Sequence, residues 1–202
     1  MGSLKFFDLA ELKSCHGATT FVETGAGWGH GIEYAQTFDF EKIWSVEIFT
    51  DLANKLAGKF AADPRVRLIN ADSVAGLEYI YTYTSGNTIT FLDAHFPGAD
   101  VGAADFGAEQ NEDIRLPLLT EMATVKRLRA DRGFKDIILL DDIMLYDDEN
   151  AYPGNGWKAA LDIMPRKNRN CYREILSFFD ETHTSQRFAE ENGFVIFFPK
   201  NP

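Results

Sequence analysis

The stretch that most constrains the fold covers residues 21–31, Phe-Val-Glu-Thr-Gly-Ala-Gly-Trp-Gly-His-Gly. An apolar run ends there at Glu23 and passes into a cluster of glycines, after which residues 32–37 have a helical pattern. Glycines at a strand-to-helix turn can adopt positive φ and let a ligand approach the backbone closely. The amide groups that begin the next helix favour a negative ligand group. We therefore expect a strand, a ligand-binding turn and a helix, unless the glycines serve only the path of the chain.

The spacing of the glycines separates two classes of ligand. The dinucleotide fingerprint requires G-x-G-x-x-G/A. Counted from Gly25 its third position falls on His30, and counted from Gly27 it falls on Ile32, so neither register matches. This mismatch counts against a nicotinamide oxidoreductase, which stays as the less favoured alternative.

The arrangement Glu23-x-Gly25-x-Gly27-x-Gly29 resembles the first motif of class I S-adenosylmethionine-dependent methyltransferases. The resemblance implies that the three glycines lie against the methionine half of the cofactor and that Glu23 lies near its ammonium group. This cofactor carries a sulfonium and an ammonium group, so a nearby carboxylate suits it better than it suits a pyrophosphate.

A second acidic residue stands where a ribose would bind. Residues 42–48 form the second expected strand, and Glu47 near its end lies 18 residues after Gly29. An acidic residue about 20 residues past the glycine turn accepts hydrogen bonds from the ribose hydroxyls. Acidic residues at strand ends are common, so Glu47 gains its meaning from the glycine turn before it.

Two polar residues follow the third expected strand, which covers residues 65–70. The resemblance implies that an acidic residue here meets the adenine amino group, and Asp72 is the matching position, with Ser73 beside it. Both residue types also suit the N-cap of the helix expected over residues 74–81. We expect Ser73 to cap that helix while Asp72 faces the ligand.

Three further acidic residues end or follow two strands. Asp93 ends the strand expected over 88–93, and Asp141 and Asp142 follow the apolar run 136–140, which is typical of the centre of a parallel sheet. Because the carboxyl ends of such strands form the ligand crevice, we expect the three carboxylates to converge. Converging carboxylates repel one another unless a proton or cation intervenes, and hard oxygen ligands suit Mg²⁺ or Ca²⁺.

The sequences Phe-Leu-Asp ending at Asp93 and Leu-Leu-Asp-Asp ending at Asp142 resemble those of metal-dependent O-methyltransferases of the catechol and macrocin types. The resemblance implies a divalent ion held by Asp93, Asp141 and Asp142, which binds the acceptor hydroxyls and lowers their pKa. The context departs from the usual pattern, because Asp93 is followed by Ala-His. His95, with an ordinary pKa of about 6.5, is a candidate base or metal ligand. The alternatives are solvated acids and a histidine bonded within its own turn.

The order of elements predicts an α/β fold: a Rossmann-like, doubly wound, mostly parallel seven-stranded sheet with an antiparallel C-terminal hairpin. The hairpin is expected from two strand-like runs, 185–189 and 194–198, around a tight Asn-Gly turn. The resemblance implies one methyltransferase-like domain over residues 1–202, with an N-terminal helix within 1–18. Two other segments stand out: a short helix expected over 157–164, and the acidic, glycine-rich segment 94–116, which we expect to act as a lid.

The amino-acid composition argues against several kinds of binding partner. The chain has 20 basic and 31 acidic residues and a formal net charge of −11, which argues against nucleic acid and against anionic membrane surfaces. Cys15 and Cys171, the two cysteines, have no metal-ligand spacing and form no disulfide framework. The start lacks the apolar core of a signal peptide, so we expect a cytoplasmic protein. An edge helix or the terminal hairpin could support a homodimer.

These features and the resemblance imply an S-adenosylmethionine-dependent methyltransferase that acts on an oxygen of a small hydroxylated molecule or sugar. S-adenosylmethionine is the expected cofactor, with Mg²⁺ or another divalent cation on the acceptor side. Asp93 and His95 are the expected catalytic residues. A non-catalytic module that binds a ligand or protein through the same fold is the main alternative, because a fold does not fix a function.

Overall fold

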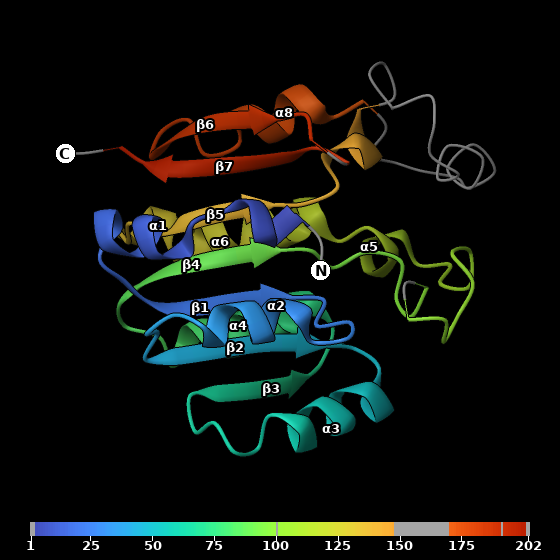
Figure 1. Cartoon of the computed structure of the whole chain (residues 1–202). Helices are drawn as coiled ribbons and strands as arrows, with labels where there is room; N and C mark the ends of the chain where they lie inside the picture. Colours follow the sequence, from blue (N-terminus) through green and yellow to red (C-terminus); the bar gives the residue numbers. More distant parts are fainter. Residues whose placement is uncertain (1–2, 100, 148–169, 191, 201–202) are drawn as a thin grey trace.

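The computed structural model describes residues 3–99, 101–147, 170–190 and 192–200 (Figure 1). The helix expected over 157–164 therefore lies outside the described residues. Within them the strands are β1 (Ala18–Thr24), β2 (Lys42–Glu47), β3 (Val66–Asn70), β4 (Asn87–Leu92), β5 (Ile137–Leu140), β6 (His183–Phe188) and β7 (Phe194–Pro199). The helices are η1 (Ser3–Phe6), α1 (Leu9–His16), α2 (His30–Gln36), α3 (Thr50–Lys59), α4 (Ser73–Thr82), α5 (Glu112–Arg115), α6 (Leu118–Leu128), η2 (Ala130–Arg132), η3 (Ile143–Tyr146) and α8 (Tyr172–Ser177).

The strands form one seven-stranded sheet with the order β3-β2-β1-β4-β5-β7-β6 (Figure 1). The strands from β3 to β5 pair in parallel, and β7 pairs antiparallel with both β5 and β6. The expected fold class is confirmed, including the antiparallel ending. The chain leaves β1 toward β3 and then returns to β4, so the order of strands reverses between β1 and β4, where such sheets bind ligands.

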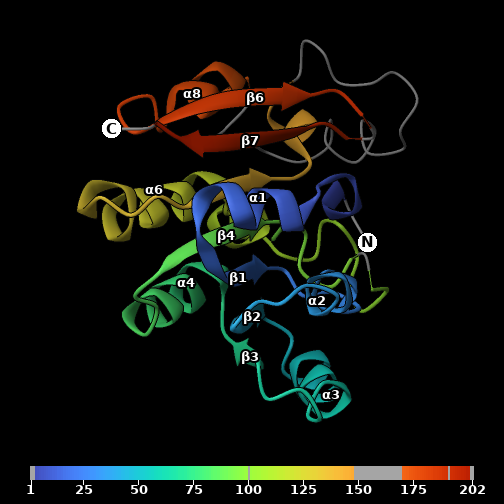
Figure 2. The same cartoon turned by 60° about the vertical axis from the view of Figure 1, so that its left-hand side comes forward.

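Helices cover both faces of the sheet (Figure 2). Phe21 of β1 packs into the apolar cluster beneath α1, α2 and α3, whereas its neighbour Val22 packs beneath α4, α6 and α8. This alternation follows from the two-residue period of a strand, and it explains why the central strands are apolar on both faces. The helices are thereby fixed on the sheet, and the loops at the carboxyl ends of the strands are left to form a site.

Several boundaries differ from the expected ones. The N-terminal helix α1 begins only at Leu9, because Asp8 accepts hydrogen bonds from the amides of Ala10 and Glu11 and caps it. The short helix α5 within the expected lid segment was not foreseen. The hairpin connection is one residue longer than expected, because β6 ends at Phe188 and not at residue 189, while β7 begins at Phe194 as expected.

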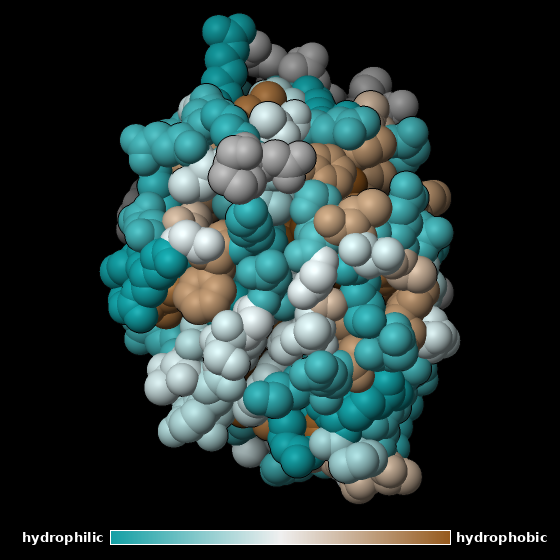
Figure 3. All heavy atoms as spheres, turned by 90° about the vertical axis from the view of Figure 1, so that its left-hand side faces the viewer, coloured by the Kyte–Doolittle hydropathy of each residue, from teal (hydrophilic) through white to brown (hydrophobic). Residues whose placement is uncertain are grey.

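The two ends of the parallel strands differ at the surface. Figure 3 views the molecule from the end where these strands begin, and hydrophilic side chains cover most of that face with apolar ones scattered among them. The loops that follow β1, β2, β4 and β5 gather at the other end (Figure 1). Among the described residues, no helix combines the length and the apolar character needed to cross a membrane.

Candidate active site

The carboxyl ends of the strands open into a cavity of about 300 Å³. Its wall is built from the β1–α2 turn, the end of β2, the β3–α4 junction and the segments after β4 and β5. Of the site residues expected from the sequence, ten line it: Glu23, Gly25, Gly27, Glu47, Asp72, Ser73, Asp93, His95, Asp141 and Asp142. The strand order thus brings segments from five parts of the chain onto one cavity.

The three glycines of the β1–α2 turn have different surroundings. Gly25 has φ 78°, and a Cβ there would lie 2.8 Å from the carbonyl oxygen of Asp93. Gly29 has φ 81° and is not part of the cavity wall; a Cβ there would meet the ring of Phe60 at 2.8 Å, so this glycine serves the packing of α2 against α3. Gly27 lines the cavity with φ 51°, and a Cβ there would meet no atom within 4 Å. Gly27 is therefore the place where a ligand can lie against the backbone.

Glu47 holds the glycine turn in place. One carboxylate oxygen, Oε2, accepts a hydrogen bond of 3.1 Å from the amide of Gly27, and Oε1 accepts one of 2.9 Å from the amide of Phe49. Burial raises the pKa of Glu47, and the backbone hydrogen bonds oppose this rise. Each carboxylate oxygen can accept more than one hydrogen bond, so these contacts leave room for ligand hydroxyls.

Glu23 lies deeper, at the end of β1, and is almost fully buried. The hydroxyl of Ser45 donates a 2.6 Å hydrogen bond to its Oε2. Burial raises the pKa of Glu23 to about 8, which the Ser45 hydroxyl opposes and the nearby Glu47 reinforces. A Cβ at Gly31 would lie 1.7 Å from Oε1, so this glycine makes the space that the carboxyl occupies. Glu23 is therefore largely protonated at pH 7 and can ionise when a cation enters the cavity.

The expected cap of α4 is wrong, because Asp72 and not Ser73 caps this helix. Asp72 is the N-cap of α4, with φ −62° and ψ 159°, and its side chain accepts a 2.9 Å hydrogen bond from the amide of Ala75. Ser73 is the first residue of the helix and does not cap it. The helix begins one residue earlier than the apolar spacing indicates, which moves the extended cap conformation onto Asp72. Both residues line the cavity.

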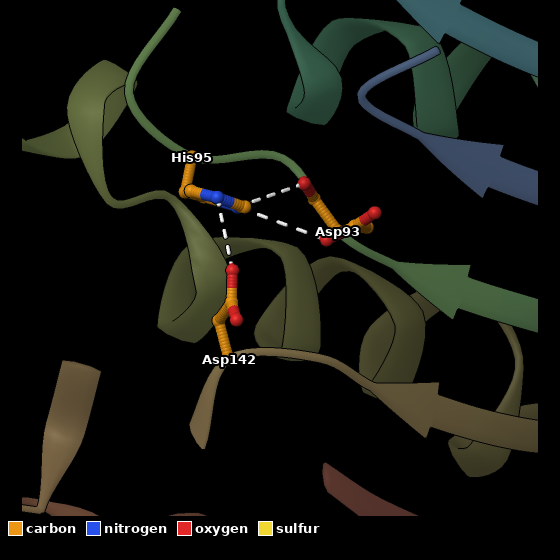
Figure 4. Close-up of side chains that lie close together, drawn as sticks. All are labelled: Asp93, His95 and Asp142. Carbon is orange, nitrogen blue, oxygen red and sulfur yellow. Dashed lines mark hydrogen bonds and ion pairs between the residues drawn. The ribbon is translucent and has the colours of Figure 1, made fainter. Parts of the chain in front are cut away.

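The adjoining wall carries Asp93, His95 and Asp142, whose side chains converge from the segments after β4 and β5 (Figure 4). One ligand atom from each lies within 4.8 Å of the others. His95 Nε2 lies 3.0 Å from Asp142 Oδ2, and Nδ1 lies 3.0 Å from the carbonyl oxygen of Asp93 and 3.7 Å from its Oδ1.

The converging group differs in one member from the expected three carboxylates. Within the described residues it holds Asp93, His95 and Asp142, and Asp141 lies beside it on the cavity wall. Asp141 Oδ1 instead accepts a 2.9 Å hydrogen bond from the amide of Asp142. Asp142 has φ 50° and ψ 39°, a left-handed conformation that non-glycine residues adopt rarely. The sequence gives no sign of this backbone conformation.

The electrostatics of this wall favour a cation. Burial raises the pKa of Asp93 well above its usual range, the charge of Asp141 adds to the rise, and His95 opposes it. For Asp142 burial alone would raise the pKa, but the charge and hydrogen bond of His95 and the hydrogen bond of Asn192 outweigh it, so its pKa is lowered. A divalent ion would supply the positive charge that two buried carboxylates need.

Two polar residues of this region were missed from the sequence. Asn192, in the hairpin turn, lines the cavity and donates a 2.7 Å hydrogen bond to Asp142 Oδ1. Glu121 of α6 is fully buried, and neither carboxylate oxygen has a well-formed hydrogen bond within the described part of the chain. Burial raises the pKa of Glu121 to about 7, and nearby hydroxyls oppose the rise. A signal existed for Glu121, which lies at helical spacing between apolar Leu118 and Val125.

Comparison with known proteins shows which solved structures share this fold. No family model matches the sequence, and no curated protein matches it. A Staphylococcus aureus structure, provisionally described as a caffeoyl-CoA O-methyltransferase, superposes with a TM-score of 0.61 at 13% identity, over 98% of this chain and 83% of that one. The Podospora anserina methyltransferase PaMTH1, solved with S-adenosylhomocysteine, gives 0.57 at 15% identity, over 95% of this chain and 76% of that one.

A third match, from Klebsiella pneumoniae and provisionally described as an O-methyltransferase, gives a TM-score of 0.53 at 13% identity, over 100% of this chain and 82% of that one. The architecture is therefore an α/β fold with a mixed seven-stranded sheet and a cavity at its switch point. More particularly, it is the fold of these methyltransferase structures, which confirms the fold class expected from the sequence.

Proposed function

We propose that this protein is an S-adenosylmethionine-dependent methyltransferase that acts on a hydroxyl oxygen of a small molecule or sugar. The observation that carries the proposal is a single cavity with two unlike walls. One wall presents a glycine turn with Glu23, Glu47 and Asp72, and the other presents Asp93, His95 and Asp142. The first suits a cationic nucleoside, and the second suits an acceptor that must lose a proton.

The cofactor wall fits S-adenosylmethionine in its chemistry. Gly27 leaves the backbone open to a ligand, Glu47 lies where ribose hydroxyls would be bound, and Asp72 lies at the third strand end. The buried acid Glu23 would be ionised by a nearby positive charge. S-adenosylmethionine, when bound, supplies a methyl group on a positively charged sulfur. The chain contributes the proximity and orientation of the acceptor oxygen.

The side chains of the acidic wall would help to remove a proton from the acceptor hydroxyl. His95 is within reach of Asp142 and can take a proton from a hydroxyl, with Asp142 stabilising the imidazolium that forms. The same three side chains offer two carboxylate oxygens and one imidazole nitrogen to a divalent cation. The imidazole suits Fe²⁺ or Zn²⁺ better than Mg²⁺ or Ca²⁺, whereas the two carboxylates suit Mn²⁺, Mg²⁺ or Ca²⁺. A bound cation would lower the pKa of the acceptor hydroxyl.

Thermal-shift measurements test the cofactor directly. S-adenosylmethionine and S-adenosylhomocysteine should each raise the melting temperature, and the rise should continue with the logarithm of their concentration above Kd, whereas NAD should not raise it. Stabilisation by NAD alone would overturn the proposal. Methyl transfer from labelled S-adenosylmethionine to a panel of catechols, flavonoids and sugars, with Mn²⁺ or with EDTA, then separates cation assistance from catalysis by His95. Binding without transfer to any acceptor would favour a non-catalytic module.

A further inference from the structure

We infer that Asn192 is a positioning residue that sets the orientation of Asp142 from the C-terminal hairpin. This inference rests on the proposed function, in which Asp142 belongs to the acceptor wall. Asn192 Nδ2 donates a 2.7 Å hydrogen bond to Asp142 Oδ1, although the two residues lie 50 positions apart in the sequence. Asn192 also lines the cavity itself.

The hairpin connection is joined to the segment after β5 by its backbone. The amide of Ile143 donates a 3.0 Å hydrogen bond to the carbonyl oxygen of Gly193, and the amide of Met144 donates one of 3.1 Å to that of Asn192. Three hydrogen bonds therefore link residues 142–144 to residues 192–193. The antiparallel hairpin thus reaches the site from the far side of β5.

These bonds act on a residue in an unfavourable conformation. Asp142 has φ 50°, a left-handed conformation that non-glycine residues adopt rarely and that persists only where the surroundings fix it. Its amide is bound to Asp141 Oδ1 and its Oδ1 to Asn192. The hairpin therefore contributes to holding Asp142 where its side chain points at His95 (Figure 4).

The hydrogen bond also assigns separate tasks to the two carboxylate oxygens of Asp142. Oδ1 accepts from Asn192, while Oδ2 lies 3.0 Å from His95 Nε2 and belongs to the converging group. Without the amide donor, the carboxylate could rotate and turn either oxygen toward the cluster. Residues that orient a ligand in this way typically change metal affinity or activity by about 10–100-fold when they are replaced.

The test compares Asn192→Ala with Asn87→Ala. Asn87 is a matched control, because its side chain donates to the carbonyl oxygen of His16 and accepts from the amide of Lys135 at the opposite end of the sheet. Mn²⁺ affinity is measured by electron paramagnetic resonance, S-adenosylhomocysteine affinity by calorimetry, and amide exchange of residues 143–144 by NMR. Asn192→Ala should lower Mn²⁺ affinity about 10–100-fold and speed this exchange, with S-adenosylhomocysteine affinity within about twofold of the wild type.

A double variant, Asp142→Asn with Asn192→Asp, separates orientation from simple support of the turn. It restores a donor and an acceptor between the two positions but moves the negative charge away from the cluster. The exchange of residues 143–144 should return toward the wild-type rate, while Mn²⁺ affinity should stay low. Recovery of Mn²⁺ affinity would show that the site needs only the turn and would overturn the inference.

Unchanged Mn²⁺ affinity and unchanged exchange in Asn192→Ala would also overturn it. If the wild type binds S-adenosylhomocysteine but no Mn²⁺, the cation part of the proposed function fails. If it binds neither, the cofactor assignment fails as well. In both cases the orientation of the Asp142 carboxylate in crystals of Asn192→Ala and of Asn87→Ala decides whether Asn192 positions Asp142, and an unchanged orientation in Asn192→Ala would overturn the inference.

Discussion

At the amino ends of β4 and β5 a buried carboxyl, that of Asp136, is paired with a buried arginine, whereas at the carboxyl ends several buried carboxyls lack such a partner. Arg129 Nε and Nη2 donate to the two oxygens of Asp136 at 2.7 and 2.8 Å, and the amide of Thr88 donates to Oδ1 at 2.6 Å. A third arginine nitrogen donates to the carbonyl oxygen of Thr84. This charge is neutralised and fully bonded.

At the carboxyl ends of the strands, where the cavity lies, the buried acidic residues have different surroundings. Glu23 and Glu121 are as deeply buried as Asp136, yet neither forms an ion pair within the described residues, and burial raises the pKa of each. Asp93 lies among other acids, with His95 as its neighbouring base. Unneutralised buried charge costs stability, and groups with raised pKa values gather at functional sites. The buried charge at the paired end is compensated, whereas the unpaired end is suited to receive a cation.

The largest effect on stability should come from breaking the buried ion pair between Arg129 and Asp136. Arg129→Met leaves the Asp136 carboxylate buried without its partner and should lower the free energy of unfolding by about 3–5 kcal/mol. Urea denaturation measures the loss. The double variant Arg129→Met with Asp136→Leu removes both charges and should recover most of it. A loss under about 1 kcal/mol in the single variant would contradict the assigned role of this pair.

Glu121→Gln should change stability in the opposite direction and raise the free energy of unfolding. The pKa of Glu121 is raised from 4.5 to about 7, so its contribution to stability is complete below pH 4.5 and is lost as the pH rises through 7. Removing the charge should therefore stabilise the protein by about 3 kcal/mol at pH 8 and by little at pH 4. Urea denaturation at the two pH values checks this. Equal stability of variant and wild type at pH 8 would show that Glu121 is compensated in the folded protein.

Asp93→Asn tests the acidic wall through activity. Removing one carboxylate from the converging group should lower methyl transfer by about 100-fold, since proton removal from the acceptor contributes at least this much. Asp141→Asn is the matched control, because Asp141 lines the same cavity but lies outside the group. Its effect on the rate should be smaller. Equal losses of the methyl-transfer rate in the two variants would show that Asp141 acts together with Asp93.

Gly27→Ala should give the smallest effect. A left-handed conformation costs a non-glycine residue about 1–2 kcal/mol, so stability should fall by about that amount. The added methyl group also enters the open space at the cavity wall, so S-adenosylhomocysteine affinity should fall about tenfold, or ~1.4 kcal/mol. Gly133→Ala is the control, with φ 79° and equal free space away from the cavity. Calorimetry should show full affinity in the control.

The fold could be predicted from the sequence because its signals are local. The apolar runs of the central strands, the glycine turn after Glu23 and the break after each helix follow from the two-residue and 3.6-residue periods and from turn chemistry. The parallel order then places the strand ends together, so Glu47 and Asp93 could be assigned to one cavity. The hairpin was foreseen for the same reason, although not its length.

The composition of the acidic wall was decided only by the tertiary structure. Within the described residues the converging group contains His95 and not Asp141, Asp142 has a left-handed backbone, and Asn192 reaches Asp142 from a hairpin 50 positions away. Periodicity assigns a residue to a face, but the direction of a side chain beyond a strand end depends on local dihedrals and on distant hydrogen bonds. The sequence alone therefore determined where the cavity lies, and the packed chain determined which side chains meet across it.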